Sequence, residues 1–125
     1  MQDKILDNKY YRAEMQDGIM IVQYKPGLHI TLKEAREIVQ ARLDHFGNIS
    51  YPVIFKSSRV KSIDKAARSY LFKEGHINLK AIALIEQTKV EKVMLSIMLN
   101  FDRPPIPCRA FDNEMDAIAW LQDFK

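Results

Sequence analysis

Two short apolar runs, residues 52–55 (PVIF) and 81–85 (AIALI), constrain the fold more than any other feature of the sequence. Neither run alternates between apolar and polar residues, which is typical of strands buried on both faces of a parallel sheet. Segments with helical periodicity lie between and around them. Strands that alternate with helices form β-α-β units with right-handed crossovers, so the sequence predicts an α/β domain.

A β-hairpin is expected before the first helix. Residues 11–15 alternate between apolar and polar side chains, and a second apolar run follows at residues 19–24. The dipeptide Asp17-Gly18 between them tolerates the positive φ angles of a tight primed turn. The hairpin therefore supplies two strands, one of which we expect at an edge of the sheet.

Four amphipathic helices follow, and each has a candidate capping residue. The expected caps are Thr31 and Thr88 in capping boxes with Glu34 and Glu91, Ser62 for the second helix, and Asp112 or Asn113 for the last. Gly47 and Gly75 are expected to end the first two helices. With a last strand at residues 108–111 (CRAF), the sequence predicts a five-stranded mixed sheet with four helices, in a single domain spanning residues 1–125.

Composition limits the broad class of protein. A chain of 125 residues with 47% apolar residues is long enough to bury a sizeable core. The N-terminus has no signal-like apolar segment, and no apolar run approaches the roughly 20 residues of a membrane span. Cys108, the single cysteine, excludes an internal disulfide and fits a reducing compartment. We therefore expect a cytoplasmic protein.

The strand and helix order, together with the tail PCRAFDNEMDAIAWLQDF, resembles the SpoIIAA-like fold. This fold is shared by STAS domains (anti-sigma-factor antagonists) and by the lipid-binding Sec14 or CRAL-TRIO group. Small bacterial STAS/Sec14-like proteins often end in a similar pattern, carried here by Phe111, Asp112, Glu114, Ala117, Ile118, Trp120 and Leu121.

The resemblance implies a test of function at the start of the second helix. Anti-sigma-factor antagonists have a turn there that runs roughly Asp-Ser-Ser-Gly, and a kinase phosphorylates the first serine. Without gaps, Asp64 matches the aspartate, Lys65 the phospho-acceptor, and Ala66 and Ala67 the next two positions. The usual phospho-acceptor serine is therefore absent from this chain.

The sequence favours neither catalysis nor metal binding. It contains no G-x-S-x-G elbow and no glycine-rich phosphate loop. Cys108 follows Pro107 at the start of a strand, where we expect a small buried side chain. His29, His45 and His76 lie far apart without the spacing of metal ligands. We expect no enzyme activity, no cofactor, no metal and no nucleic-acid partner.

Residues 56–74 carry six basic residues against two acidic ones, in a chain whose net charge is only +3. Such a segment is compatible with a plain solvated helix face. The alternative is a weak surface for an anion or an acidic partner at the start of the second helix. The candidate residues for that surface are Arg59, Lys61, Ser62 and Lys65.

The third expected helix, at residues 89–101, is apolar on more than one side. Leu95, Met98 and Leu99 spread beyond its inner stripe and need a cover. Three covers are possible: the following loop at residues 102–107, a second subunit, or an acyl ligand. We expect a homodimer or higher homo-oligomer that uses this face.

Two functional classes follow. The first is a non-enzymatic regulatory or protein-interaction module that resembles STAS domains without their phospho-acceptor serine. The alternative is a small carrier of a lipid-like or other apolar ligand, as in the Sec14 group.

Overall fold

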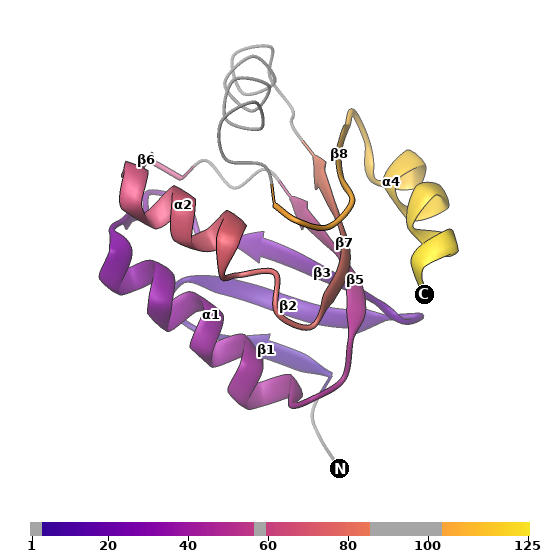
Figure 1. The fold of residues 1–125 in the computed structure, drawn as a ribbon, viewed down its shortest axis with the longest axis horizontal. Coiled ribbons are helices and arrows are strands. Elements are labelled where there is room, and N and C mark those ends of the chain that lie inside the picture. The colour runs from indigo at the N-terminus through magenta and orange to yellow at the C-terminus, as the bar shows by residue number, and fades with distance from the viewer. Residues whose placement is uncertain (1–3, 57–59, 86–103) are drawn as a thin grey trace.

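A six-stranded mixed sheet forms the centre of the molecule (Figure 1). The computed structural model describes residues 4–56, 60–85 and 104–125. The strands lie in the order β1-β2-β3-β5-β7-β8; the first three pair antiparallel, and β3, β5, β7 and β8 pair parallel. Their bounds are Ile5–Asp7 for β1, Tyr11–Gln16 for β2, Ile19–Tyr24 for β3, Tyr51–Lys56 for β5, Leu79–Ile85 for β7 and Cys108–Phe111 for β8.

The expected parallel α/β core is confirmed, but the expected strand number is wrong. β1 pairs with β2 and takes the edge position predicted for the hairpin. Two further short strands, β4 (His29–Ile30) and β6 (Ser62–Ile63), form a separate parallel ribbon. These three strands have two or three residues each, too few to show an alternating pattern in the sequence.

The hairpin between β2 and β3 is confirmed. Asp17 and Gly18 have φ angles of 51° and 82°, and the residues on either side of them, Gln16 and Ile19, are paired. Positive φ at both central residues is the requirement of a type I′ turn, whose twist matches that of the strands.

The described helices cover the two faces of the sheet unequally (Figure 1). α1 (Leu32–Phe46) and α2 (Lys65–Lys73) pack side by side on one face. α4 (Glu114–Leu121), continued by a 3₁₀ turn at Gln122–Phe124, lies on the opposite face against β5, β7 and β8. The helix expected at residues 89–101 lies outside the described residues.

The ends of α1 follow the sequence prediction with one difference. Gly47, at φ 70°, ends the helix, and its N–H donates to the Leu43 carbonyl at 3.0 Å. Thr31 precedes the helix as expected. Its hydroxyl donates to the Glu34 carboxylate and makes no capping bond to a backbone N–H, so the predicted reciprocal box is wrong in that respect.

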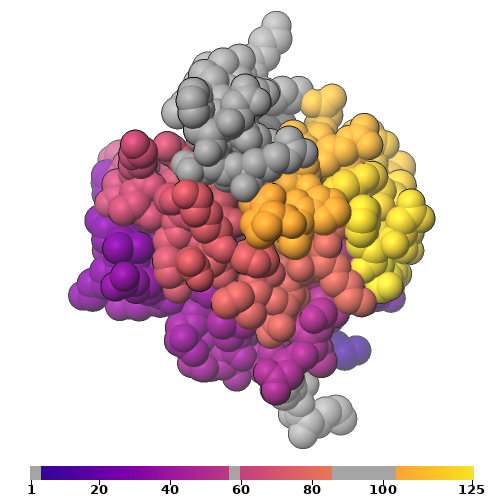
Figure 2. All heavy atoms as spheres, in the orientation of Figure 1, coloured from indigo at the N-terminus to yellow at the C-terminus, as the bar shows by residue number. Residues whose placement is uncertain are grey.

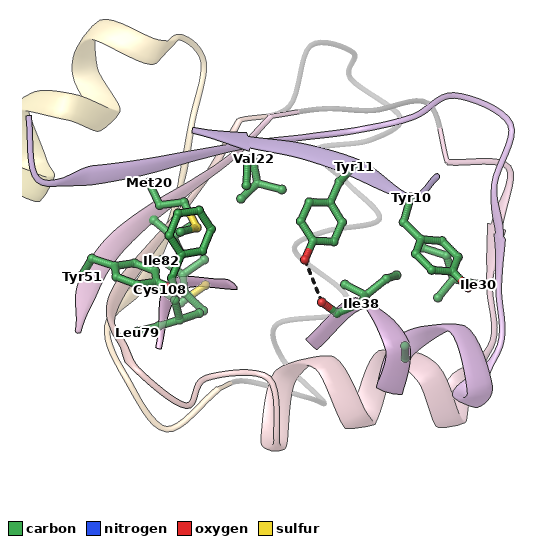
Figure 3. Packing of buried hydrophobic residues seen from close by; sticks show 14 of the residues in the cluster. Tyr10, Tyr11, Met20, Val22, Ile30, Ile38, Tyr51, Leu79, Ile82 and Cys108 are labelled. Carbon is green, nitrogen blue, oxygen red and sulfur yellow. Dashed lines mark hydrogen bonds between the residues drawn. The ribbon is translucent and has the colours of Figure 1, made fainter. Parts of the chain in front are cut away.

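The larger core lies between the sheet and the pair α1 and α2 (Figure 3). Tyr11 is 2% exposed, and its hydroxyl donates to the Ile38 carbonyl at 2.9 Å. Burial raises the pKa of Tyr11 to about 12. Under α4, a second core is built from small and branched side chains, including Ile54, Ala83 and Leu121. The predicted burial of the 52–55 and 81–85 strands on both faces is thus confirmed for most of their residues.

In the described part of the chain, no helix combines the length and the apolar character that crossing a membrane requires.

Candidate functional site

The start of α2 is the candidate site suggested by the sequence, and its cap differs from the prediction. Asp64, not Ser62, is the N-cap: its Oδ1 accepts from the Ala67 N–H at 2.8 Å. Ser62 lies two residues earlier, in β6. Serine and aspartate both cap helices. Because Ser62 is paired with β4 as part of β6, the helix begins later and Asp64 is its cap.

Hydrogen bonds to β4 and to Leu28, the residue before it, occupy the backbone N–H groups around Ser62. The N–H groups of Lys61 and Ser62 both donate to the Leu28 carbonyl, at 2.8 and 3.1 Å. The Asp64 N–H donates to the Ile30 carbonyl at 3.1 Å. These amides are therefore not directed at a ligand.

The first turn of α2 still presents donors to solvent. The first helical backbone bond runs from the Arg68 N–H to the Asp64 carbonyl at 2.9 Å. Lys65 and Ala66 precede it, so their N–H groups lie ahead of the helical ladder, at the positive end of the helix dipole. Both residues are exposed, and so is Lys61.

A histidine and a serine face each other across the β4–β6 ribbon. His29 Nδ1 and Ser62 Oγ are 2.6 Å apart, and both residues are exposed. This side-chain bond fixes the ribbon beside the start of α2. Three of the four predicted site residues, Lys61, Ser62 and Lys65, are exposed at the β6–α2 junction, and their role as a binding surface stays a prediction. Arg59 lies outside the described residues.

The residues that match the phospho-acceptor turn occupy the cap and first turn of α2. The matched aspartate, Asp64, is the N-cap. Lys65, Ala66 and Ala67 are the first three residues of the helix, and none has a hydroxyl. Ala67 is fully buried, so its position has no room for a larger side chain without movement.

Other candidate chemistry is sparse in the described part of the chain. No group of three His, Cys, Asp or Glu side chains gathers there in a way that could hold a metal ion. Cys108 is buried, as predicted for a small apolar side chain. His76 Nδ1, in the turn after α2, is buried without a hydrogen-bond partner in the described part of the chain.

A polar groove that the sequence does not predict lies on the outer face of the sheet. It occupies about 130 Å³ between β2, β3 and the start of α4. Ile21 lies in its lining with Arg12 and Glu14, and an ion pair between Lys56 Nζ and Glu114 Oε2, at 3.4 Å, bounds one side. The groove follows from the uneven covering of the sheet, since α4 packs mainly on β5, β7 and β8.

The second predicted site cannot be placed. Leu95, Met98 and Leu99 lie outside the described residues, so the apolar face for a second subunit or an acyl ligand stays a prediction. On the α1 and α2 side, the described residues form a cluster of buried apolar side chains (Figure 3).

Comparison with solved structures identifies the fold. A protein from Thermotoga maritima, provisionally described as an anti-sigma factor antagonist, aligns with a TM-score of 0.61 at 18% identity; the alignment covers 90% of this chain and 94% of that one. An uncharacterised protein of the DUF3478 family with a SpoIIAA-like fold, from Shewanella loihica, aligns with a TM-score of 0.57 at 14% identity, over 93% and 98% of the two chains. The chain therefore has the SpoIIAA-like fold that its sequence resembles.

Comparison with curated proteins finds no match. Residues 13–125 match the family described as Domain of unknown function (DUF7793). Because this match spans most of the sequence, the chain belongs to the DUF7793 family.

Proposed function

We propose that the protein is a non-enzymatic regulatory module that binds an acidic partner protein through the start of α2. One observation supports this proposal above the others: α2 begins with the exposed cation Lys65, which the ungapped sequence match aligns with the phospho-acceptor of anti-sigma-factor antagonists. The structural neighbour from Thermotoga maritima is described as such an antagonist, which suggests a role in protein interaction.

The charge arrangement decides which partner this surface suits. Lys61 and Lys65 lie on either side of the exposed β6 end, and the helix dipole adds positive potential from the same direction. Phosphorylation would make such a site anionic, whereas Lys65 keeps it positive at all times. The module is then not switched at this position by a kinase, and its binding depends on the charge of the partner.

The position of Lys65 in the helix also supports a binding role for its charge. A cation in the first turn of a helix opposes the dipole and costs a few tenths of a kcal/mol. Asp64 offsets part of this cost, since its carboxylate lies at the same end. A binding role for Lys65 gives a reason for a residue that helix stability alone disfavours.

An NMR titration of ¹⁵N-labelled protein with a poly-glutamate peptide tests the proposal. We expect saturable amide shifts at residues 61–67 that weaken as salt is added, because exposed charge pairs are screened. The double variant Lys61→Ala/Lys65→Ala should lose these shifts. Lys73→Ala, at the other end of the same helix, is the matched control and should keep them.

Shifts elsewhere with none at residues 61–67 would contradict the proposal. So would shifts that the double variant retains in full.

A further inference from the structure

Two exposed side chains of the β4–β6 ribbon, His29 and Ser62, form a polar pair beside the start of α2. Their hydrogen bond joins His29 Nδ1 and Ser62 Oγ at 2.6 Å. The two residues are register partners in the parallel ribbon, so their side chains leave it on the same face. The next pair along the ribbon, Ile30 and Ile63, belongs to the apolar core. The ribbon therefore buries its apolar pair and directs its polar pair to solvent.

The polar pair lies next to the basic residues of the proposed partner surface. The Lys61 N–H donates to the Leu28 carbonyl at 2.8 Å, which places Lys61 beside the residue that precedes His29. Ser62 follows Lys61 directly, and Lys65 begins α2 three residues later. An acidic segment bound by Lys61 and Lys65 therefore comes next to His29 and Ser62 as well.

Protonation of His29 fixes which group donates in the bond of the polar pair. A neutral imidazole with its hydrogen on Nε2 accepts through Nδ1, and the Ser62 hydroxyl is then the donor. A protonated imidazole carries a hydrogen on each nitrogen, so Nδ1 donates and Ser62 Oγ accepts. The bond is made in both states, but in the second state the hydroxyl hydrogen of Ser62 is released for another acceptor. Protonation thus adds one positive charge and one further donor to the exposed face of the ribbon.

The other charges around His29 stay constant near neutral pH. β4 packs against β6 and α1, and α1 and α2 lie side by side at the surface (Figure 2). The charged residues that these elements bring to the ribbon are Lys61, Asp64 and Lys65 around the start of α2, and Lys33, Glu34, Arg36 and Glu37 in the first turns of α1. Both glutamates accept hydrogen bonds from neutral hydroxyls, those of Thr31 and Tyr10. Histidine is the side-chain type that ordinarily changes charge between pH 6 and 8, so the change in local charge falls on His29.

We propose that the polar pair makes the partner surface at the start of α2 sensitive to pH, so that an acidic partner binds more tightly when His29 is protonated; this rests on the function proposed above. Protonated His29 extends the positive charge of Lys61 and Lys65 along the ribbon. Its Nε2–H and the released Ser62 O–H then both donate to carboxylates of the partner. Because binding and protonation are linked, the partner also draws a proton to the ribbon as it binds.

A purely structural role of the polar pair has a different consequence. Holding the two strands together requires only the side-chain hydrogen bond, which either protonation state makes. The backbone bonds from Lys61 and Ser62 to the Leu28 carbonyl are independent of pH in this range. A structural role therefore predicts an affinity for acidic partners that is the same on both sides of neutral pH.

NMR titration of the ¹⁵N-labelled full chain with a hexa-aspartate peptide at about pH 6 and about pH 8 tests the proposal, because aspartate stays ionised at both. We expect saturable amide shifts at residues 61–67, with a dissociation constant about threefold lower at the acidic pH, the effect of one exposed charge pair. His29→Gln keeps a side chain that bonds to the Ser62 hydroxyl and should abolish this gain. Ser62→Ala keeps the titrating imidazole and should retain only part of the gain.

His45→Gln is the matched control, since it removes a histidine in the last turn of α1 and should keep the whole gain. A dissociation constant that is the same at the two pH values, or a gain that His29→Gln retains, would overturn the role of the polar pair alone. Absence of saturable shifts at residues 61–67 at both pH values would overturn the proposed function as well.

Discussion

Replacing Arg42 with alanine should destabilise the protein by about 3 kcal/mol, a large effect for one residue of a helix. Arg42 is 5% exposed, on the inner face of α1. Its Nη1 donates to the Tyr51 hydroxyl and its Nη2 to the Gly75 carbonyl, each at 3.0 Å. Both acceptors are neutral groups, a hydroxyl and a backbone carbonyl, so no carboxylate balances the charge of Arg42 in these two bonds.

The magnitude follows from what the truncation leaves behind. Truncation to alanine removes two buried methylenes, Cγ and Cδ, which are worth about 1.6 kcal/mol. The Tyr51 hydroxyl and Gly75 carbonyl lose their charged donor, at about 1–3 kcal/mol each, and Tyr51 is only 3% exposed, so water cannot replace it. Relief of the desolvation cost of the guanidinium offsets part of this loss. Arg42→Met retains the apolar stem and should therefore be milder than Arg42→Ala.

Urea unfolding followed by circular dichroism measures these differences by linear extrapolation. Arg36→Ala is the matched control, since it makes the same change at an exposed position of the same helix and should stay within about 0.5 kcal/mol of wild type. If Arg42→Ala and Arg36→Ala unfold at the same urea concentration, the assignment of Arg42 as a core residue fails.

Three further outcomes are expected from the same unfolding assay. Asp64→Ala should cost about 1 kcal/mol by removing the acceptor for the Ala67 N–H, whereas Asp64→Asn should keep most of the cap; equal losses would contradict the capping role. Gly18→Ala should cost about 1–2 kcal/mol from its φ of 82° alone, because an added Cβ meets only the Lys125 side chain at an ordinary 3.6 Å; a neutral result would refute the strain argument. Between pH 10 and 12, Tyr11 ionises in the unfolded chain but not in the folded one, where its pKa is about 12, so stability should fall by about 1.4 kcal/mol per pH unit from this group; Tyr11→Phe should remove that part of the slope, and an unchanged slope would exclude it.

The parallel core could be predicted because its evidence is local. Residues 81–85 show a continuous apolar run in the sequence, and only burial on both faces makes such a run favourable. The turn at Asp17 and Gly18 is similarly decided by two adjacent residues. Neither prediction needed knowledge of distant parts of the chain.

Tertiary pairing decided the features that the sequence did not predict. On α1, Ile38 and Arg42 are buried, whereas the apolar Leu43 is only half-buried. A charged residue gives no apolar signal, and the acceptors that make its burial possible, Tyr51 and Gly75, come from other elements. β1 was missed because its three residues become a strand only through pairing with β2.

At the start of α2, the basic residues could be predicted from the sequence, but the hydrogen bonds of the backbone amides depend on tertiary pairing. This pairing limits the affinity of the proposed partner surface. Lys61 and Lys65 are exposed there, but an anion bound by the helix end would compete with Asp64, whose carboxylate already accepts from the Ala67 N–H. The amides of Ser62 and Asp64 already donate to the carbonyls of Leu28, just before β4, and of Ile30 in β4. Attraction then falls mainly on the exposed side chains of Lys61 and Lys65, whose pairs with a partner are weak and screened by salt. Weak binding with a steep salt dependence is therefore the expected behaviour of this surface, and tight binding that is insensitive to salt would require a different one.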